Sequence, residues 1–181
     1  METEGASFSE QLLDASRRNN VDLLETILDT LNHDKDKIAH LINESEDPFG
    51  NTAIHLCCKY GSWEVLDKIL DQEGDIEIDP QNRNGDTPLH LAVKYSEDEP
   101  EHGTFIAQNL IEVGADPRVR NNDGHRPIDL IHSTELDELA DLLQGAELAA
   151  DSVAVAAGSG EPFGETDEVI EEVEDDDDDE E

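Results

Sequence analysis

Apolar residues recur along most of the chain at the spacing of amphipathic helices. Four apolar side chains stand three or four positions apart in the segment 63–70: Trp63, Leu66, Ile69 and Leu70. This spacing places them on one face of a helix. The segment 13–28 has the same order of apolar positions as the segment 55–70. One helix pair of this length cannot bury its apolar face alone, so the pattern predicts several pairs that stack on one another.

A glycine comes shortly before the start of three of the predicted helices. Gly50, Gly85 and Gly124 lie 35 and 39 residues apart, in turns where a positive φ is least costly for glycine. Thr52 and Thr87 each follow two residues after a turn glycine and are suited to cap the helix that begins there. The chain therefore carries a repeated turn and helix start, and not only a repeated helix.

The segment Thr87-Pro88-Leu89-His90-Leu91-Ala92 is similar to the T-P-L-H-x-A signature of ankyrin repeats, whose period is about 33 residues. Thr52-Ala53-Ile54-His55 is a weaker copy. The resemblance covers roughly residues 8–145 and implies an all-α ankyrin-repeat solenoid of about four helix-turn-helix repeats. Two extra residues after Leu70 and a six-residue insertion at Ser96–Glu101 explain the longer spacings. We expect loops at Ser96–Glu101 and at Asn32–Asp47, with room for a short helix in the latter.

Within that family, two segments resemble a small, uncharacterised fungal group of budding-yeast type that carries an acidic C-terminus: CCKYGSWEVLDKILDQE and EPEHGTFIAQNLIEVGADPRVRN. The resemblance implies protein binding and names no partner.

Composition divides the chain into three parts. Residues 1–7 are predicted to be disordered, residues 8–145 to form the repeat domain, and residues 146–181 to be a disordered acidic tail. The tail has too little apolar surface to offset the entropy of ordering it. The chain carries 48 acidic and 11 basic residues, a formal net charge of −37. This charge argues against nucleic acid and anionic lipid as partners.

Neither a signal peptide nor a stretch of 18 apolar residues is present, so we expect no membrane span and a cytoplasmic or nuclear protein. We also expect a monomer. Cys57 and Cys58 are neighbours and cannot easily bridge each other. The resemblance places His55 and His90 at the structural histidine of the signature and the two cysteines at its small buried positions. We find no catalytic, phosphate-binding or metal-binding motif and expect no enzyme activity, cofactor or metal.

The resemblance places the partner-binding residues on the concave face, made by the turn tips and the first helices. Ten positions align with the variable contact positions of the family: Lys59, Tyr60, Arg83, Asn84, Asp86, Lys94, Tyr95, Arg120, Asn122 and His125. Four of the 11 basic residues are in this set, and Arg118 and Arg126 are close to it in sequence. These cations either bind a partner or only keep the edges of the repeats soluble.

Two functions follow from this picture. The first is an adaptor or scaffold that binds a protein partner through the concave face. The alternative is a chaperone or escort of a basic client, such as a ribosomal protein or a histone, which uses the acidic tail.

Overall fold

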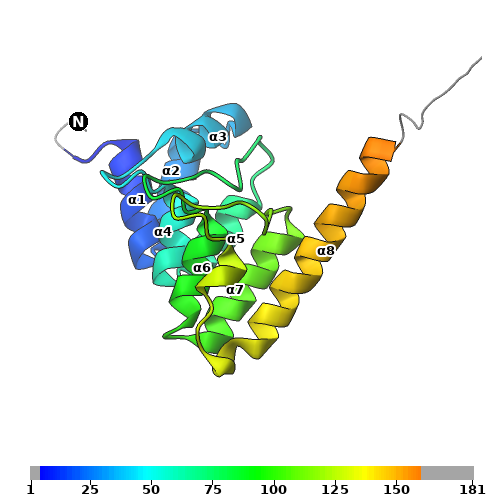
Figure 1. The fold of residues 1–181 in the computed structure, drawn as a ribbon. Coiled ribbons are helices and arrows are strands. Elements are labelled where there is room, and N and C mark those ends of the chain that lie inside the picture. Colours follow the sequence, from blue (N-terminus) through cyan, green and yellow to red (C-terminus); the bar gives the residue numbers. More distant parts are fainter. Residues whose placement is uncertain (1–4, 160–181) are drawn as a thin grey trace, which may run out of the picture. The chain divides into compact units, whose positions relative to one another are not determined.

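The computed structural model describes residues 5–159. The chain divides into two compact units, residues 1–143 and residues 144–181. Every regular element among the described residues is helical, as Figure 1 shows. The prediction of an all-α repeat fold is confirmed.

Three helix pairs form the body of the first unit. The first helices of the pairs are α1 (Phe8–Arg18), α4 (Ala53–Tyr60) and α6 (Pro88–Ser96). The second helices are α2 (Val21–Thr30), α5 (Trp63–Leu70) and α7 (Pro100–Glu112). Helices α1, α4 and α6 pack side by side as an inner row (Figure 1). The second helices pack behind this inner row.

A threonine and a histidine start both α4 and α6. The Thr52 Oγ1 atom accepts a hydrogen bond from the His55 backbone N–H, and His55 Nδ1 accepts one from the Thr52 N–H at 3.1 Å. Thr87 and His90 make the same reciprocal cap. The outer ring nitrogen of each histidine then donates to a backbone carbonyl of the next repeat, at 2.8 Å. The prediction that both histidines are structural is confirmed.

Two of the inner helices, α1 and α4, end in left-handed residues that turn the chain into the second helix. Gly61 takes this role after α4 with φ of 70°. Asn19 replaces glycine after α1, with φ of 54°, and asparagine tolerates this region better than most residues. The Asn19 side chain also accepts a hydrogen bond from the Val65 N–H at 3.1 Å and so links the first repeat to the second.

One core runs through all three pairs. Each pair contributes large, fully buried side chains to this core: Leu12, Leu24, Ile27, Ile54, Leu56, Leu66, Ile69, Leu89, Ile106 and Leu110. Cys57 and Cys58 are completely buried free thiols. Burial raises the pKa of the Cys57 thiol to about 12 and raises the pKa of Cys58 well above its usual range. Both cysteines therefore behave as small apolar residues, as predicted.

Two of the expected loops are largely helical. Helix α3 (Lys35–Glu44) fills most of the segment 32–47, because the Asp34 side chain caps its first turn and the side chains of Ile38 and Ile42 are buried. In the segment 96–101, α6 continues to Ser96 and α7 begins at Pro100, so that only residues 97–99 connect them. Proline is well suited to the first turn of a helix. The predicted loop at 96–101 was therefore wrong, and the helix within 32–47 is longer than the short one that was allowed for there.

The fourth repeat departs from the pattern of the other three. Its first element is a single 3-10 turn, η2 (Pro127–Leu130), followed by η3 (Thr134–Leu136). The Asp129 carboxylate caps η2 by accepting a hydrogen bond from the Arg126 N–H at 2.9 Å, and the backbone becomes extended at Ile131. The turn therefore cannot lengthen into an α-helix.

Helix α8 (Asp137–Ser159) corrects the predicted boundary of the acidic tail. Residues 146–159 were expected to be disordered, but they are helical. Leu139 and Leu143 are buried within the first unit, so the costly first turn of the helix is already formed there. The alanine-rich sequence that follows has a high helix propensity. The predicted disorder of residues 160–181 and of residues 1–4 lies outside the described residues.

Candidate partner-binding groove

Three equivalent side chains build the turns in front of α4, α6 and η2. Each lies three residues before a turn glycine: Asp47, Asn82 and Asn121. In each turn the Oδ1 atom accepts hydrogen bonds from two backbone N–H groups; for Asn82 these belong to Asn84 at 2.9 Å and Asp86 at 3.0 Å. The repeat-to-repeat spacing of these three residues equals that of the glycines, so sequence comparison could have found them.

The turns are also joined to one another. The Asn82 side chain donates to Asn51 Oδ1 at 2.8 Å, and the Asn121 side chain donates to Asp86 Oδ1 at 2.9 Å. Backbone hydrogen bonds continue this ladder, from Arg83 N–H to the Phe49 carbonyl and from Asn122 N–H to the Asn84 carbonyl. The turn tips are therefore one connected edge and not independent loops.

Asp86 is a structural carboxylate at the base of this edge. Its side chain is 1% exposed. The carboxylate accepts a hydrogen bond from the Asn121 side chain. It also forms an ion pair with the Lys94 ammonium at 2.8 Å, and the Lys94 side chain is 48% exposed. The sequence assigned Asp86 a direct contact with a partner, but its burial limits it to positioning Lys94. The pattern of the turn could not distinguish a buried aspartate from an exposed one.

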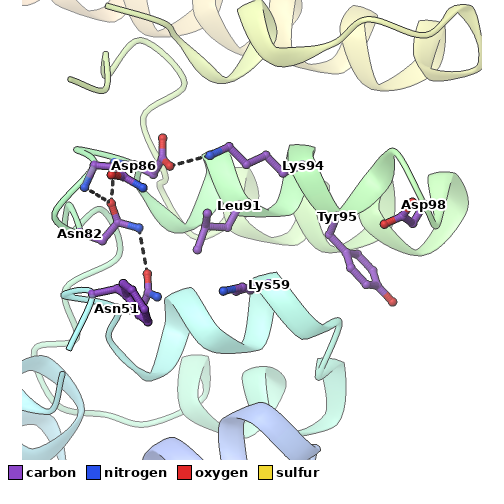
Figure 2. Close-up of a pocket in the computed structure, with 10 residues that line it drawn as sticks. Asn51, Lys59, Asn82, Asp86, Leu91, Lys94, Tyr95 and Asp98 are labelled. Carbon is purple, nitrogen blue, oxygen red and sulfur yellow. Dashed lines mark hydrogen bonds and ion pairs between the residues drawn. The ribbon is translucent and has the colours of Figure 1, made fainter. Parts of the chain in front are cut away.

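A groove of about 340 Å³ lies between α4 and α6, and Figure 2 shows the side chains that border it. Ten residues line it: Phe49, Asn51, Lys59, Asn82, Asn84, Asp86, Leu91, Lys94, Tyr95 and Asp98. Leu91 points between the two helices, while Asp86 and Asp98 lie at opposite ends (Figure 2). The groove thus combines an apolar floor with polar and charged walls, which is the composition of a recognition surface.

Burial sets the protonation of the two histidines behind this edge. Desolvation lowers the pKa of both His55 and His90 below the ordinary value. Both rings are therefore neutral at physiological pH. They serve as hydrogen-bonding links between repeats and contribute no charge to the groove.

Comparison with known proteins agrees with this architecture. A family model described as ankyrin repeats in three copies matches residues 12–121, which is more than half of the chain. The chain belongs to the ankyrin-repeat family. It is 73% identical to the ankyrin repeat-containing protein YGL242C of Saccharomyces cerevisiae over 162 residues, covering 89% of this chain and 88% of that protein.

More distant relatives match only part of this ankyrin-repeat protein. Protein phosphatase 1 regulatory subunit 27 of Mus musculus is 35% identical over 101 residues, or 56% of this chain and 60% of that protein. Ankyrin repeat-containing protein P1E11.10 of Schizosaccharomyces pombe is 34% identical over 99 residues, or 54% of this chain and 42% of that protein. The chain thus covers less than two thirds of each of these two proteins.

The groove brings together half of the predicted site residues. Five of the ten line it: Lys59, Asn84, Asp86, Lys94 and Tyr95. Arg83, Arg120, Asn122 and His125 belong to the turn tips and are exposed, and Tyr60 is 48% exposed at the end of α4. The groove also contains Leu91 and Asp98, which the sequence did not single out, because nothing in a helical repeat marks which residues border a neighbour.

The predicted basic character of the face is only partly present. Arg118 pairs with Asp116, Arg126 with Asp129, and Lys94 with Asp86. Arg120 donates to the Gly124 carbonyl at 2.8 Å. Within the described residues, Lys59 has no carboxylate at ion-pair distance, and its ammonium lies 5.6 Å from the centre of the Tyr60 ring. Lys59 is therefore the cation of the groove that is most available to a ligand.

Among the described residues, no cluster of three or more histidine, cysteine, aspartate or glutamate side chains could hold a metal ion. In the same part of the chain, no helix is both long enough and apolar enough to span a bilayer.

Proposed function

We propose that this ankyrin-repeat protein is a non-enzymatic adaptor or scaffold, and that a protein partner binds in the groove between α4 and α6. Ankyrin repeats are generally protein-interaction modules, and the mouse relative is named as a regulatory subunit of a phosphatase. The observation that supports this site best is that five of the predicted contact residues line one groove of about 340 Å³.

Exposed aromatic side chains next to the groove strengthen the proposal. Phe49 is 67% exposed at the turn tip and Tyr60 is 48% exposed. Aromatic residues are enriched at interface hot spots, because they supply a large contact area at a low cost in conformational entropy. The hydrogen-bonded turns hold Phe49 in place before binding, because its backbone N–H donates to Asp47 and its carbonyl accepts from Arg83.

The test is a comparison of partners captured from cells by the full-length chain and by two double variants. Phe49→Ala with Tyr60→Ala removes aromatic area at the groove. Phe105→Ala with Val113→Ala removes apolar residues of 43% and 45% exposure from α7 and its C-terminal end. Proteins lost only with the first variant support the proposal. If the first variant keeps every partner, or the second loses the same ones, the groove is not the binding site.

Escort of a basic client is the second candidate function, and one observation on the second helices α5 and α7 favours it. A notch of about 140 Å³ between α5 and α7 is lined by Trp63, Leu70 and Val113 and by three carboxylates: Asp67, Asp71 and Glu112. Trp63 also packs edge-on against Phe105 with ring centres 4.7 Å apart. An aromatic wall beside carboxylates suits a lysine or arginine side chain. Basic clients lost on Asp67→Asn with Asp71→Asn, but kept by the groove variant, would support this candidate; their retention would count against it.

A further inference from the structure

Acidic residues are missing from the two inner helices that border the groove. The chain has 48 acidic residues against 11 basic ones, yet α4 and α6 contain no aspartate or glutamate. Their only Lys or Arg residues are Lys59 and Lys94. The second helices behind them differ, since α5 and α7 both carry acidic residues. Charge is therefore segregated across the repeats, with cations towards the groove.

The cations also stand at one register. Lys59 and Lys94 are 35 residues apart, the spacing of Gly50 and Gly85, and Arg17 takes the same position in α1. A cation in the last helical turn is favoured by the helix dipole. That reason applies equally to the second helices, but of these only α5 has a basic residue in its last turn, Lys68, while the last turns of α2 and α7 have none. The dipole alone therefore does not explain why all three inner helices end with a cation.

The two lysines differ in how they would meet a ligand. The Lys94 ammonium is held at 2.8 Å by the buried Asp86 carboxylate, which fixes its direction but uses only one of its three donor hydrogens. Lys59 has no carboxylate partner in the described part of the chain. Both border the same groove, with Leu91 between them and with Tyr95 and Asp98 towards the far end (Figure 2). An anionic group that enters the groove beside the two lysines therefore meets positive charge. The inner helices place no exposed carboxylate there that would repel it.

We infer that the groove selects an acidic segment of the partner protein. Carboxylates of that segment pair with Lys59 and Lys94, and an apolar side chain between them packs on Leu91. Neighbouring helices pack about 8–10 Å apart. A polyproline II segment has three residues per turn and rises about 3.1 Å per residue, so carboxylates three residues apart lie on one face, about 9 Å apart, and match the two lysines. This inference rests on the proposed function and assigns the chemical class of the partner at that site.

The test uses the full-length protein and a labelled peptide of about 12 residues with glutamate at every third position, the repeat of polyproline II, and leucine or serine between. A matched peptide has glutamine in place of each glutamate. Binding is measured by fluorescence anisotropy at about 0.15 M salt, where repulsion by the remote acidic residues is screened beyond about 8 Å. The glutamate peptide is expected to bind more tightly than the glutamine peptide.

Two charge variants identify the site of binding. Lys59→Gln should weaken binding of the glutamate peptide about two- to fivefold, as expected for one exposed ion pair, and should leave the glutamine peptide unaffected. Lys68→Gln is the control, because Lys68 on α5 pairs with Glu25 at 3.0 Å away from the groove. Unchanged melting temperatures would show that both variants fold.

Three results would overturn the inference: equal affinity for the two peptides, no effect of Lys59→Gln, or an equal effect of Lys68→Gln. A chain ending at Ser159 provides one further check. If only this shortened chain binds the peptide, the acidic residues 160–181 compete for the groove, and the assignment to a partner's segment fails. If the Phe49 and Tyr60 variant loses cellular partners while Lys59→Gln keeps them, the proposed function stands and the acidic class alone is refuted.

Discussion

Replacing Asp79 with asparagine is expected to stabilise the first unit. The Asp79 Oδ2 atom accepts a 3.0 Å hydrogen bond from the Asp116 N–H, but the Oδ1 atom is buried with no hydrogen-bond partner among the described residues. Desolvation raises the pKa of this carboxyl to about 6, with smaller contributions from the charges of Asp116 and Glu77. An asparagine retains a carbonyl oxygen for the Asp116 N–H and places no charge in this site.

The magnitude follows from the pKa difference between the folded and unfolded states. A rise of about two pKa units corresponds to about 3 kcal/mol of differential interaction at neutral pH. Because the Asp79 carboxylate is only partly buried, solvent screening reduces this to about 1–2 kcal/mol. The folded state keeps its proton between about pH 4 and pH 6 while the unfolded state releases it, so wild-type stability falls as pH rises through this window.

Urea denaturation at pH 7 and at pH 5 measures the effect. Asp79→Asn should raise the free energy of unfolding at pH 7 by about 1–2 kcal/mol, and about half of the gain should remain at pH 5. The control is Asp116→Asn, where hydrogen bonds from Arg118 lower the pKa of the carboxyl, so that this substitution should destabilise. A gain for Asp79→Asn that is equal at both pH values, or a loss at pH 7, would refute the electrostatic reasoning.

Three further predictions concern the repeats. Gly61→Ala should lower the free energy of unfolding by about 2 kcal/mol in urea denaturation, because φ is 70° and the new methyl group meets the Tyr95 hydroxyl; an unchanged midpoint would contradict this. Cys57 and Cys58 should react with a thiol reagent only after denaturation, since both are fully buried, and rapid labelling of the native protein would show otherwise. Asn82→Ala removes three side-chain hydrogen bonds and should cost about 2 kcal/mol, whereas a melting temperature equal to the wild type would show that the turn ladder is dispensable.

The sequence predicted the parts of the fold that depend on local, repeated chemistry. The predictions for the threonine and histidine caps of α4 and α6 and for the turn glycines were correct, because each of these residues provides a hydrogen bond or a positive φ within its own turn. The helical content of the segment 32–47 was underestimated, although Ile38 and Ile42 are four residues apart. A short apolar pattern of this kind becomes a helix only when a neighbour buries it.

The candidate site was harder to predict, because it depends on contacts between repeats. Alignment selected Lys59, Lys94 and Tyr95, and these three residues line one groove. It could not show that Asp86 is buried under Lys94, since a turn residue has the same pattern whether its carboxylate faces solvent or a neighbouring turn. The burial of Asp79 was equally hidden, because the segment around it has no regular structure.

Photo-crosslinking in cells can distinguish a partner bound at the groove from one bound on the second helices. The photoreactive residue p-benzoylphenylalanine would replace Phe49 at the groove in one full-length variant and Phe105 on α7 in another, both exposed positions. If the partner binds in the groove, irradiation in cells links position 49, and not position 105, to a partner protein, and Lys59→Gln reduces the yield. A partner linked only from position 105 would contradict binding in the groove.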